Sequence, residues 1–415
     1  MKVIGNNAII NIIQRTLNQI DNRLIDHGKR VAFLVSKLLE EQGKYSEKQR
    51  QDICILALLH DVGAYKTEEI DRLVTFEIEN IWEHAVYGYL FVKHLSPLSR
   101  YAEAILFHHL NYDKLVEIDC MYQDLAQIFY LADRVDVFLT NGTGNIRELK
   151  ERLELSREKR FASEAVDIFL RAEEKYHICA CVLDELNFNE ILGELKLTAE
   201  ERHAYLNLLV STIDFRSRYT VAHTITTTEI SRMLASYFKL EDELQQKVFY
   251  GAMLHDLGKI GIPVEILEYP GKLSAQAMQI MRTHVDLTER ILGGEVDETA
   301  EKIALRHHEK LDGSGYPKGL VAADLTLAER IMAVADIVSA LLGVRSYKRA
   351  FSKNLTLQIV QEMSEQGKID PEVVSMFALH YEEIMAGVEK ATKPAMENYE
   401  EIAREYTKLM DNYFH

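Results

Sequence analysis

The sequence predicts an all-α protein made of two tandem copies of one helical module. Only 6 Pro and 20 Gly occur in 415 residues, and the abundant Leu, Ala, Glu, Lys and Ile favour helix. No alternating Val, Ile and Thr segments of convincing strand length appear. Residues 26–41 are typical of the helices expected, because Val31, Leu34, Val35 and Leu38 form one apolar stripe.

Seven His and Asp residues recur in each half of the chain at similar intervals. The intervals 27 to 60, 60 to 84, 84 to 108 and 109 to 133 span 33, 24, 24 and 24 residues. Those from 223 to 255, 255 to 284, 284 to 307 and 308 to 336 span 32, 29, 23 and 28 residues. Segments beyond the last Asp also match, RFASEAVDIFL at 160–170 and KIDPEVVSMFA at 368–378. This self-similarity indicates a duplication with an offset of roughly 200 residues.

The duplication predicts two domains, at residues 1–190 and 195–415. A chain of 415 residues is long enough for two cores. Residues 145–200 are charged and helix-favouring rather than rich in Gly and Ser, which predicts a stiff connection. Residues 382–415 predict an acidic amphipathic helix whose Met, Leu, Tyr and Phe positions serve internal packing or form the face of a homodimer.

Composition excludes several classes of protein. A net charge of −17 offers no basic face for a nucleic-acid polymer. No segment approaches 18 uninterrupted apolar residues, so no membrane span is expected, and the amino terminus lacks the cleavage site of a signal peptide. The four Cys show no disulfide framework, which favours reduced thiols in a cytoplasmic protein.

His255 and Asp256 are adjacent residues at the end of an apolar helical run. Adjacent helical side chains diverge by about 100°, so they rarely converge unless the helix ends there. Gly258 and Gly261 follow at once, and Pro263 prevents continuation of the helix. An isolated pair of this kind is more often a buried His beside a capping Asp. That interpretation weakens because four more His residues and a second Asp flank the pair.

Five imidazoles and two carboxylates exceed what a single metal ion needs. The seven residues are His223, His255, Asp256, His284, His307, His308 and Asp336. Neutral imidazoles suit Zn, Fe, Mn, Ni or Cu, and a carboxylate can bridge two ions. Two ions roughly 3.5–4 Å apart stabilise both oxygens of a phosphoryl displacement and generate hydroxide near neutral pH. The pattern therefore predicts a dinuclear hydrolase.

Residues 211–370 resemble the HD-GYP family of phosphodiesterases. The matching stretches are YTVAH (219–223), HDLGKIGIP (255–263), HHEKLDGSGYP (307–317), VADIVSALL (334–342) and RSYKRA (345–350). The resemblance implies an all-helical HD-type domain that hydrolyses a cyclic dinucleotide, usually cyclic di-GMP, to a linear dinucleotide (pGpG) or further to GMP. Hydrolysis of 3′,3′-cyclic GMP-AMP, and a non-catalytic nucleotide-responsive signalling protein, are the alternatives.

The resemblance also implies roles for single residues. Asp256 would bridge two divalent ions, Fe or Mn with Ni or Zn as alternatives. The first ion would be bound by His223, His255, Asp256 and Asp336, and the second by Asp256, His284, His307 and His308. Lys259 would act on the scissile phosphate or its leaving oxygen, so Asp256 and Lys259 are the catalytic candidates. Substrate would be held by Arg345, Lys348 and Tyr316, although Lys348 also fits a solvated surface cation.

Two positions depart from the family pattern. Some members carry a Glu four residues before the first His, where it supports a third ion, and Tyr219 stands there in this chain. A neutral phenol is a poor ligand, so we expect two ions. Three residues past Asp336 the family often has an Asp, and this chain has Ser339. That change leaves open whether a base contact is made from the position, and with it the choice between guanine and adenine.

The first module keeps all seven candidate ligands but lacks the residues around them. The ligands are His27, His60, Asp61, His84, His108, His109 and Asp133. Ala64 stands where Lys259 stands, and the segment HHLNYDKLVEIDC has no GYP loop. Buried polar groups need partners, so seven such residues are poorly explained as mere core histidines and aspartates. We therefore expect an HD-type domain that binds metal without hydrolysing a cyclic dinucleotide.

Overall fold

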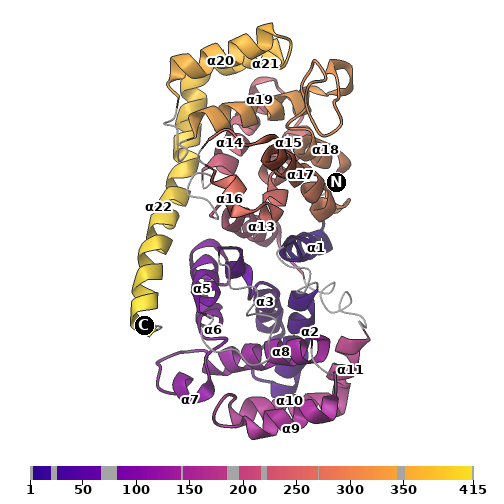
Figure 1. Cartoon of the computed structure of the whole chain (residues 1–415), viewed down its shortest axis with the longest axis vertical. Coiled ribbons are helices and arrows are strands. Elements are labelled where there is room, and N and C mark those ends of the chain that lie inside the picture. Colours follow the sequence, from indigo (N-terminus) through magenta and orange to yellow (C-terminus); the bar gives the residue numbers. More distant parts are fainter. Residues whose placement is uncertain are drawn as a thin grey trace. The chain divides into compact units, whose positions relative to one another are not determined.

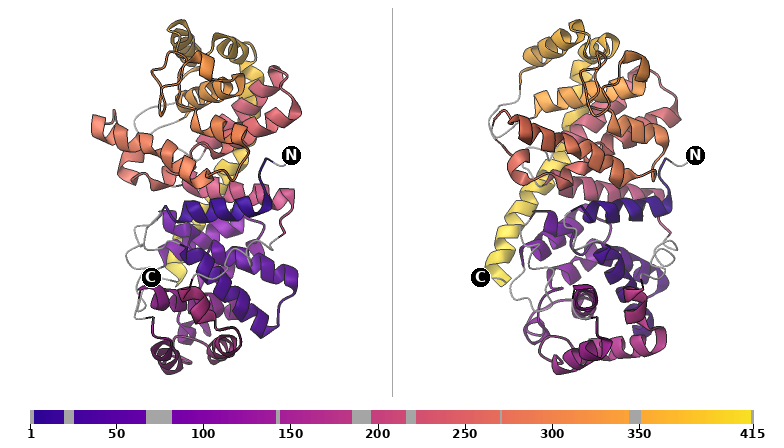
Figure 2. Two further views of the ribbon diagram at one scale, coloured as in Figure 1. Left: turned by 90° about the vertical axis from the view of Figure 1, so that its right-hand side faces the viewer. Right: turned by 45° about the vertical axis from the view of Figure 1, so that its right-hand side comes forward.

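A computed structural model describes the protein over residues 3–19, 26–66, 82–141, 144–184, 196–215, 222–269, 271–343 and 351–413. Within these ranges the chain is helical, as both views in Figure 2 show, and its β structure is limited to isolated bridges. None of the described helices is both long and apolar enough to cross a membrane. The all-α prediction is confirmed.

The first module begins with α1, which precedes the helices that carry the first ligands (Figure 1). Its elements are α1 (Asn6–Leu17), α2 (His27–Gln42), α3 (Glu47–Leu58), η2 (Val62–Lys66), α5 (Glu83–Leu95), η3 (Ser99–Tyr101), α6 (Ala102–Leu106), α7 (Tyr112–Leu115), α8 (Gln123–Asn141), α9 (Ile146–Leu155), α10 (Ser163–Tyr176) and α11 (Ile178–Leu183).

The second module repeats the order of the elements that carry or adjoin the ligands. It contains α13 (Ala199–Asp214), α14 (His223–Tyr237), α15 (Asp242–Leu254), η4 (Leu257–Gly261), α16 (Val264–Leu267), α17 (Ala275–Leu292), α18 (Glu298–Leu305), η5 (Ala322–Asp324), α19 (Leu327–Leu342), α20 (Lys353–Glu365), α21 (Pro371–Leu379) and α22 (Tyr381–Tyr413). The ligand-bearing elements α2, α3, η2, α5, α6 and α8 correspond in order to α14, α15, η4, α17, α18 and α19. The duplication read from the His and Asp intervals is therefore a duplication of helices.

The chain divides into two compact units, and each unit includes a short terminal segment from the other half of the sequence. One unit holds residues 9–208 and 402–415, and the other holds residues 1–8 and 209–401. Helix α22 contributes to both, and its last turns belong to the first unit, where Glu405 pairs with Lys93 at 2.8 Å and Tyr406 stacks on Tyr87. The expected boundary at 190–195 stays a prediction, because residues 185–195 lie outside the described ranges.

A buried apolar core supports the ligand-bearing helices of the second module. Ile230 and Leu234 on α14 pack with Val334 and Val338 on α19, and all four side chains are fully buried. Thr326 caps α19 by accepting a hydrogen bond from the amide of Glu329, whose side chain bonds back to the amide of Thr326. The core therefore holds two helices that begin or pass beside the candidate site in a defined orientation.

A glycine in each module lets the helix after the His-Asp pair lie against the pair. A Cβ atom on Gly258 would meet the carbonyl oxygen of His284 at 1.9 Å, and one on Gly63 would meet that of His84 at 2.0 Å. Real Cβ atoms do not approach backbone oxygen so closely, so only glycine fits at either position. This close approach brings the third His of each module next to its His-Asp pair.

Candidate metal centres

The seven candidate ligands of the second module, which we call the second cluster, converge from five helices. His223 opens α14, His255 and Asp256 follow the last residue of α15, and Asp336 lies on α19. His284 lies on α17, and His307 and His308 follow α18. The ligand atoms of His223, His255 and Asp256 lie within 4.8 Å of one another, and so do those of His284, His307 and His308. The structure thus brings together every ligand that the sequence predicts.

The carboxylate of Asp256 lies between the two groups of imidazoles. Its Oδ2 is 3.4 Å from Nε2 of His223 and 3.0 Å from Nε2 of His255. Its Oδ1 faces the other way, 3.5 Å from Nε2 of His284 and 4.0 Å from Nε2 of His307. One carboxylate with a separate oxygen for each group is the arrangement of a bridging ligand.

Asp336 also faces both groups. Its Oδ1 lies 3.2 Å from Nε2 of His223 and 3.7 Å from Nε2 of His255. Its Oδ2 lies 3.5 Å from Nδ1 of His308. The two carboxylates therefore supply the negative charge of the cluster, and both lie close to Nε2 of His223 and of His255.

Backbone carbonyl groups set which ring nitrogen of each buried His points into the second cluster. Nδ1 of His255 lies 2.7 Å from the carbonyl oxygen of Ala252, and Nδ1 of His284 lies 2.7 Å from that of Met281. His307 makes the same contact with Ala304 at 2.6 Å. Since a carbonyl only accepts, Nδ1 carries the proton and Nε2 is left with a lone pair for a metal ion.

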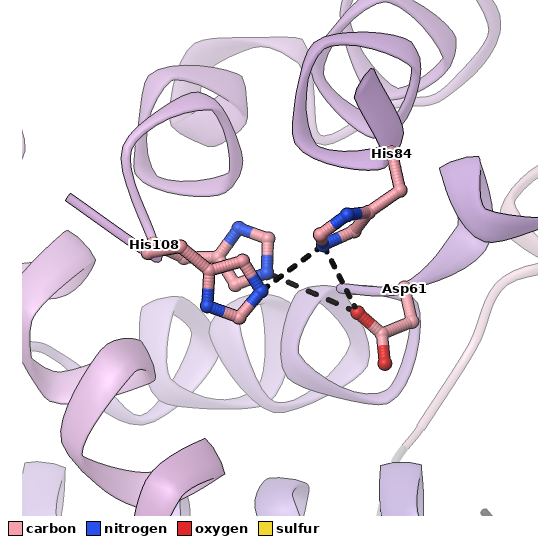
Figure 3. Close-up of side chains that lie close together, drawn as sticks. Asp61, His84 and His108 are labelled. Atoms are coloured by element: carbon pink, nitrogen blue, oxygen red, sulfur yellow. Dashed lines mark hydrogen bonds and ion pairs between the residues drawn. The ribbon is translucent and has the colours of Figure 1, made fainter. Parts of the chain in front are cut away.

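The seven candidate ligands of the first module, which we call the first cluster, are arranged in a similar way. They are His27, His60, Asp61, His84, His108, His109 and Asp133. Oδ2 of Asp61 lies 3.7 Å from Nε2 of His27 and 3.4 Å from Nε2 of His60. Figure 3 shows the other oxygen facing His84 and His108, whose Nε2 atoms are 3.7 and 3.9 Å away. Asp133 spans His27 and His109 at 3.3 and 3.5 Å, as Asp336 spans its own pair.

Buried polar atoms without hydrogen-bond partners show that both clusters fit metal ions. Among the described residues, Nε2 of His255 and Oδ1 of Asp256 are buried with no hydrogen bond. Nε2 of His60, Oδ1 of Asp61 and Nε2 of His108 are orphaned in the same way. An unsatisfied buried polar group costs about 1–3 kcal/mol, and a cation at the centre of each cluster would satisfy these atoms together.

The protonation states of the second cluster suit metal binding, with one exception. Burial lowers the pKa of His308 to about 3 and that of His307 well below its usual range, so both imidazoles are neutral. Burial opposes ionisation of Asp256, but its interactions with His255, Lys259 and His223 outweigh burial and hold the carboxyl pKa well below its usual range. Burial also opposes the charge on His223, yet its bonds to Asp256 and Asp336 raise its pKa to about 9.

Lys259 and the GYP loop border the second cluster. The ammonium group of Lys259 contacts Oδ2 of Asp256. The ring of Tyr316 lies 4.6 Å from that of His308, with the guanidinium of Arg282 4.7 Å from the tyrosine ring. Glu309 fixes the loop by accepting hydrogen bonds from the amides of Lys318 and Leu320. The sequence did not single out Arg282, which is exposed and carries no motif.

Three residues named from the sequence stay outside this geometry. Arg345 and Lys348 fall in residues 344–350, and Tyr219 falls in residues 216–221, all outside the described ranges. Their roles therefore stay predictions.

Ser339 has a structural contact in place of the base contact considered for its position. Its hydroxyl group lies 3.0 Å from Nδ1 of His223 and donates to the carbonyl oxygen of His223 at 3.1 Å. The matching residue of the first module is Asp136, whose Oδ2 lies 2.6 Å from Nδ1 of His27. Sequence reasoning missed Asp136, although its place three residues past Asp133 was visible from the duplication.

Thr288 is a third residue that the sequence did not reveal. It is fully buried on α17, one turn after His284. Its hydroxyl accepts a hydrogen bond from the amide of Gly258 at 2.9 Å and donates one to the carbonyl oxygen of His255 at 3.1 Å. The first module has Gly88 at this position, so only the second module ties its His-Asp turn to the next helix in this way.

Comparison with known proteins identifies both modules. One HD domain model matches residues 24–137, and another matches residues 203–373. The chain is 30% identical over 385 residues to 3′3′-cGAMP-specific phosphodiesterase 1 of Vibrio cholerae, covering 87% of this chain and 88% of the relative. The cyclic di-GMP phosphodiesterase response regulator RpfG of Xanthomonas campestris is 35% identical over 44% of this chain and 49% of its own.

A solved structure shares the fold. The crystal structure of the cyclic GMP-AMP-specific phosphodiesterase V-cGAP3 of V. cholerae superposes with a TM-score of 0.56, covering 91% of this chain and 97% of its own at 19% identity. With a relative of 30% identity that spans both modules, the chain belongs to the HD-GYP family of cyclic dinucleotide phosphodiesterases and carries a further HD domain in its N-terminal half.

Proposed function

We propose that the second module hydrolyses one phosphodiester bond of a cyclic dinucleotide and that its substrate is 3′,3′-cyclic GMP-AMP. Water adds to phosphorus, the bond from phosphorus to the 3′ oxygen breaks, and the released 3′ oxygen takes up a proton. The product is a linear dinucleotide with a 5′ phosphate. The observation that carries the proposal is the position of Asp256, which directs one oxygen to each of two imidazole groups.

The second cluster holds the catalytic ions in this proposal, and the surrounding residues arrange the substrate. Two divalent ions, Fe or Mn with Ni or Zn as alternatives, would supply a nucleophile at neutral pH and offset charge on phosphate oxygens. His223, His255 and Asp336 hold one side of the site, and His284, His307 and His308 the other. His307 and His308 on the second side are neutral, so they add no positive charge to offset that of the two carboxylates.

Lys259 and Tyr316 act on the substrate rather than on the ions. The ammonium group of Lys259 contacts Asp256, so a phosphate bound beside the cluster would lie close to this positive charge. A positive charge fixed at that place stabilises charge that develops on the scissile phosphate. Tyr316, next to His308, offers a ring face at the edge of the cluster against which a base or ribose can pack.

The choice of 3′,3′-cyclic GMP-AMP is supported by the relative that aligns with both modules, which is named for that substrate. A second V. cholerae relative named for it, 3′3′-cGAMP-specific phosphodiesterase 2, is 37% identical over 48% of this chain and 39% of its own length. Cyclic di-GMP is the second candidate, favoured by relatives such as RpfG that are named for it.

The test is turnover of both substrates by the full-length protein loaded with Mn²⁺ or Fe²⁺. The linear product is separated by chromatography and identified by mass, which also shows whether hydrolysis continues to mononucleotides. We expect a higher kcat/KM for cyclic GMP-AMP than for cyclic di-GMP. The opposite ratio would transfer the assignment to cyclic di-GMP, and no product from either would reject the hydrolytic function.

The first module binds metal without hydrolysing the cyclic dinucleotide in this proposal. Its seven ligands converge as those of the second do, but Ala64 replaces the lysine and its sequence contains no GYP loop. A homodimer and a cytoplasmic location stay predictions of the sequence.

A further inference from the structure

We infer that Asp136 is a positioning residue that strengthens metal binding by the first cluster. The second cluster has the hydroxyl group of Ser339 at the same place, and a hydroxyl group at position 136 would give weaker binding. The inference rests on the proposal that both clusters bind metal. It concerns two residues that lie outside both ligand sets and occupy the same place in the duplicated modules.

Both residues bond the same ring nitrogen of the same ligand. Oδ2 of Asp136 is 2.6 Å from Nδ1 of His27, and the hydroxyl of Ser339 is 3.0 Å from Nδ1 of His223. In each module the other nitrogen, Nε2, points at the two ligand carboxylates, at distances of 3.2–3.7 Å. Asp136 and Ser339 are 1% and 2% exposed, so water competes for neither bond.

The chemistry of the two partners differs. A carboxylate that accepts the Nδ1 proton draws it from the ring and makes Nε2 a stronger donor to a metal ion. A hydroxyl accepts the same proton more weakly, because it carries no charge. The hydroxyl of Ser339 also donates a hydrogen bond to the carbonyl oxygen of His223, which fixes the hydroxyl without adding charge. The two histidines are thus oriented alike but differ in donor strength.

A buried arginine, Arg30, balances the charge of the buried Asp136 carboxylate in the first module. Nε of Arg30 is 2.5 Å from Oδ1 of Asp136, and its Nη2 is 3.1 Å from Oδ2. The second module has Thr226 at the position of Arg30. The first module therefore has a charged pair where the second has two hydroxyl residues. Because Arg30 balances the charge of Asp136, we expect the effect on metal binding to pass through His27.

The experiment measures metal affinity in the full-length protein, not turnover. The second cluster is disabled by His255→Ala with Asp256→Ala, and Mn²⁺ or Zn²⁺ is titrated into this background against a chelator of known affinity. Loss of a partner of this kind costs 10–100-fold in metal affinity. We expect Asp136→Ser to raise the Kd by about 10–100-fold and to shift the d–d absorption bands of bound Co²⁺.

Two further variants separate tuning of the metal from damage to the fold. Asp136→Ser alone leaves Arg30 buried without its carboxylate, so Asp136→Ser with Arg30→Thr copies the pair of the second module and should show the same loss. Asp52→Asn is the matched control, because Asp52 is also a buried carboxylate paired with an arginine, Arg100 at 3.0 Å, and its other ion pair is with Lys48 rather than with a cluster residue. It should leave the Kd and the Co²⁺ spectrum unchanged.

The outcomes distinguish this inference from the proposed function. Metal uptake by the background protein together with a Kd that both Asp136 variants leave within threefold would overturn the inference alone. An equal loss in Asp52→Asn would also overturn it, since the effect would then be general destabilisation. No uptake by the background protein at all would overturn both the inference and metal binding by the first module.

Discussion

The ammonium group of Lys259 contacts Oδ2 of Asp256, the same carboxylate oxygen that faces His223 and His255. In the first module the corresponding Asp61 keeps its contacts with two histidines, but Ala64 supplies no cation. The contact between a lysine and a bridging carboxylate therefore distinguishes two clusters whose seven candidate ligands are arranged alike. It is also the simplest structural reason to expect that only one of them hydrolyses a phosphodiester.

Replacing Asp256 by alanine should remove the metal from the second cluster. Asp256 directs one oxygen toward each imidazole group, so neither group keeps its complete ligand set without it. We expect metal content to fall and hydrolysis to be lost, while circular dichroism still reports a folded helical protein. Full activity in a well-folded Asp256→Ala variant would contradict a dinuclear centre.

Replacing Lys259 by alanine should slow turnover without removing metal. The loss of a preorganised charge at transition-state oxygens typically costs 10²–10³-fold in kcat. Metal analysis and steady-state kinetics on the same preparation test both halves of the prediction. Lys247→Ala is the control, since Lys247 on α15 pairs with Glu243 at 3.0 Å and with Asp297 at 3.3 Å rather than with Asp256. An unchanged rate in Lys259→Ala would make Lys259 an ordinary surface cation.

Replacing His60 and Asp61 together by alanine should lower total bound metal but leave hydrolysis in place. These residues lie in the first cluster, which has neither the lysine nor a GYP loop. The matched change at His255 and Asp256 should abolish hydrolysis altogether. If the first pair alone eliminated turnover while the second cluster kept its metal, the division of roles between the modules would be wrong.

Replacing Thr288 by valine should destabilise the second module. Valine keeps the shape but leaves the amide of Gly258 and the carbonyl oxygen of His255 without their buried partner. Leaving a buried polar group unsatisfied costs about 1–3 kcal/mol, measured as the change in the free energy of unfolding of the metal-free protein. Thr288→Ser retains the hydroxyl and should recover most of this loss; equal stability of the valine and serine variants would refute the role of these bonds.

Metal uptake by the second cluster should strengthen as pH rises. In the metal-free protein the pKa of His223 is raised from 6.5 to about 9, so near neutral pH its Nε2 carries a proton that a metal ion must displace. Affinity therefore increases as pH rises toward about 9, and loading at pH 7 releases the proton of His223. The contribution of this imidazolium to the stability of the metal-free protein has the opposite trend, because it is complete below about pH 6.5 and is lost as pH rises through about 9.

Isothermal titration of Mn²⁺ in buffers of different ionisation enthalpy measures this proton release. Observed heats that do not depend on the buffer would contradict it. Tris and phosphate are unsuitable buffers if they compete for the ion, so sulfonate buffers are preferred.

The sequence by itself determined the fold class, the duplication and the candidate ligands. A helix places its apolar residues at a fixed period, so the stripe of α2 is readable from residues 26–41 alone. His and Asp at repeated intervals mark equivalent positions, because each module repeats the same order of helices. The end of the helix before His255 and Asp256 was equally local, since Gly258, Gly261 and Pro263 follow directly.

Only the tertiary structure decided which atoms meet. Asp136 and His27 are 109 residues apart, and Ser339 and His223 are 116 apart, so no local pattern links them. Thr288 bonds the turn at His255 across 33 residues, and the fit of Gly258 against His284 depends on how closely two helices pack. Such contacts follow from the packing of whole helices around a core. A sequence pattern can nominate ligands, but it cannot assign each oxygen and ring nitrogen to its partner.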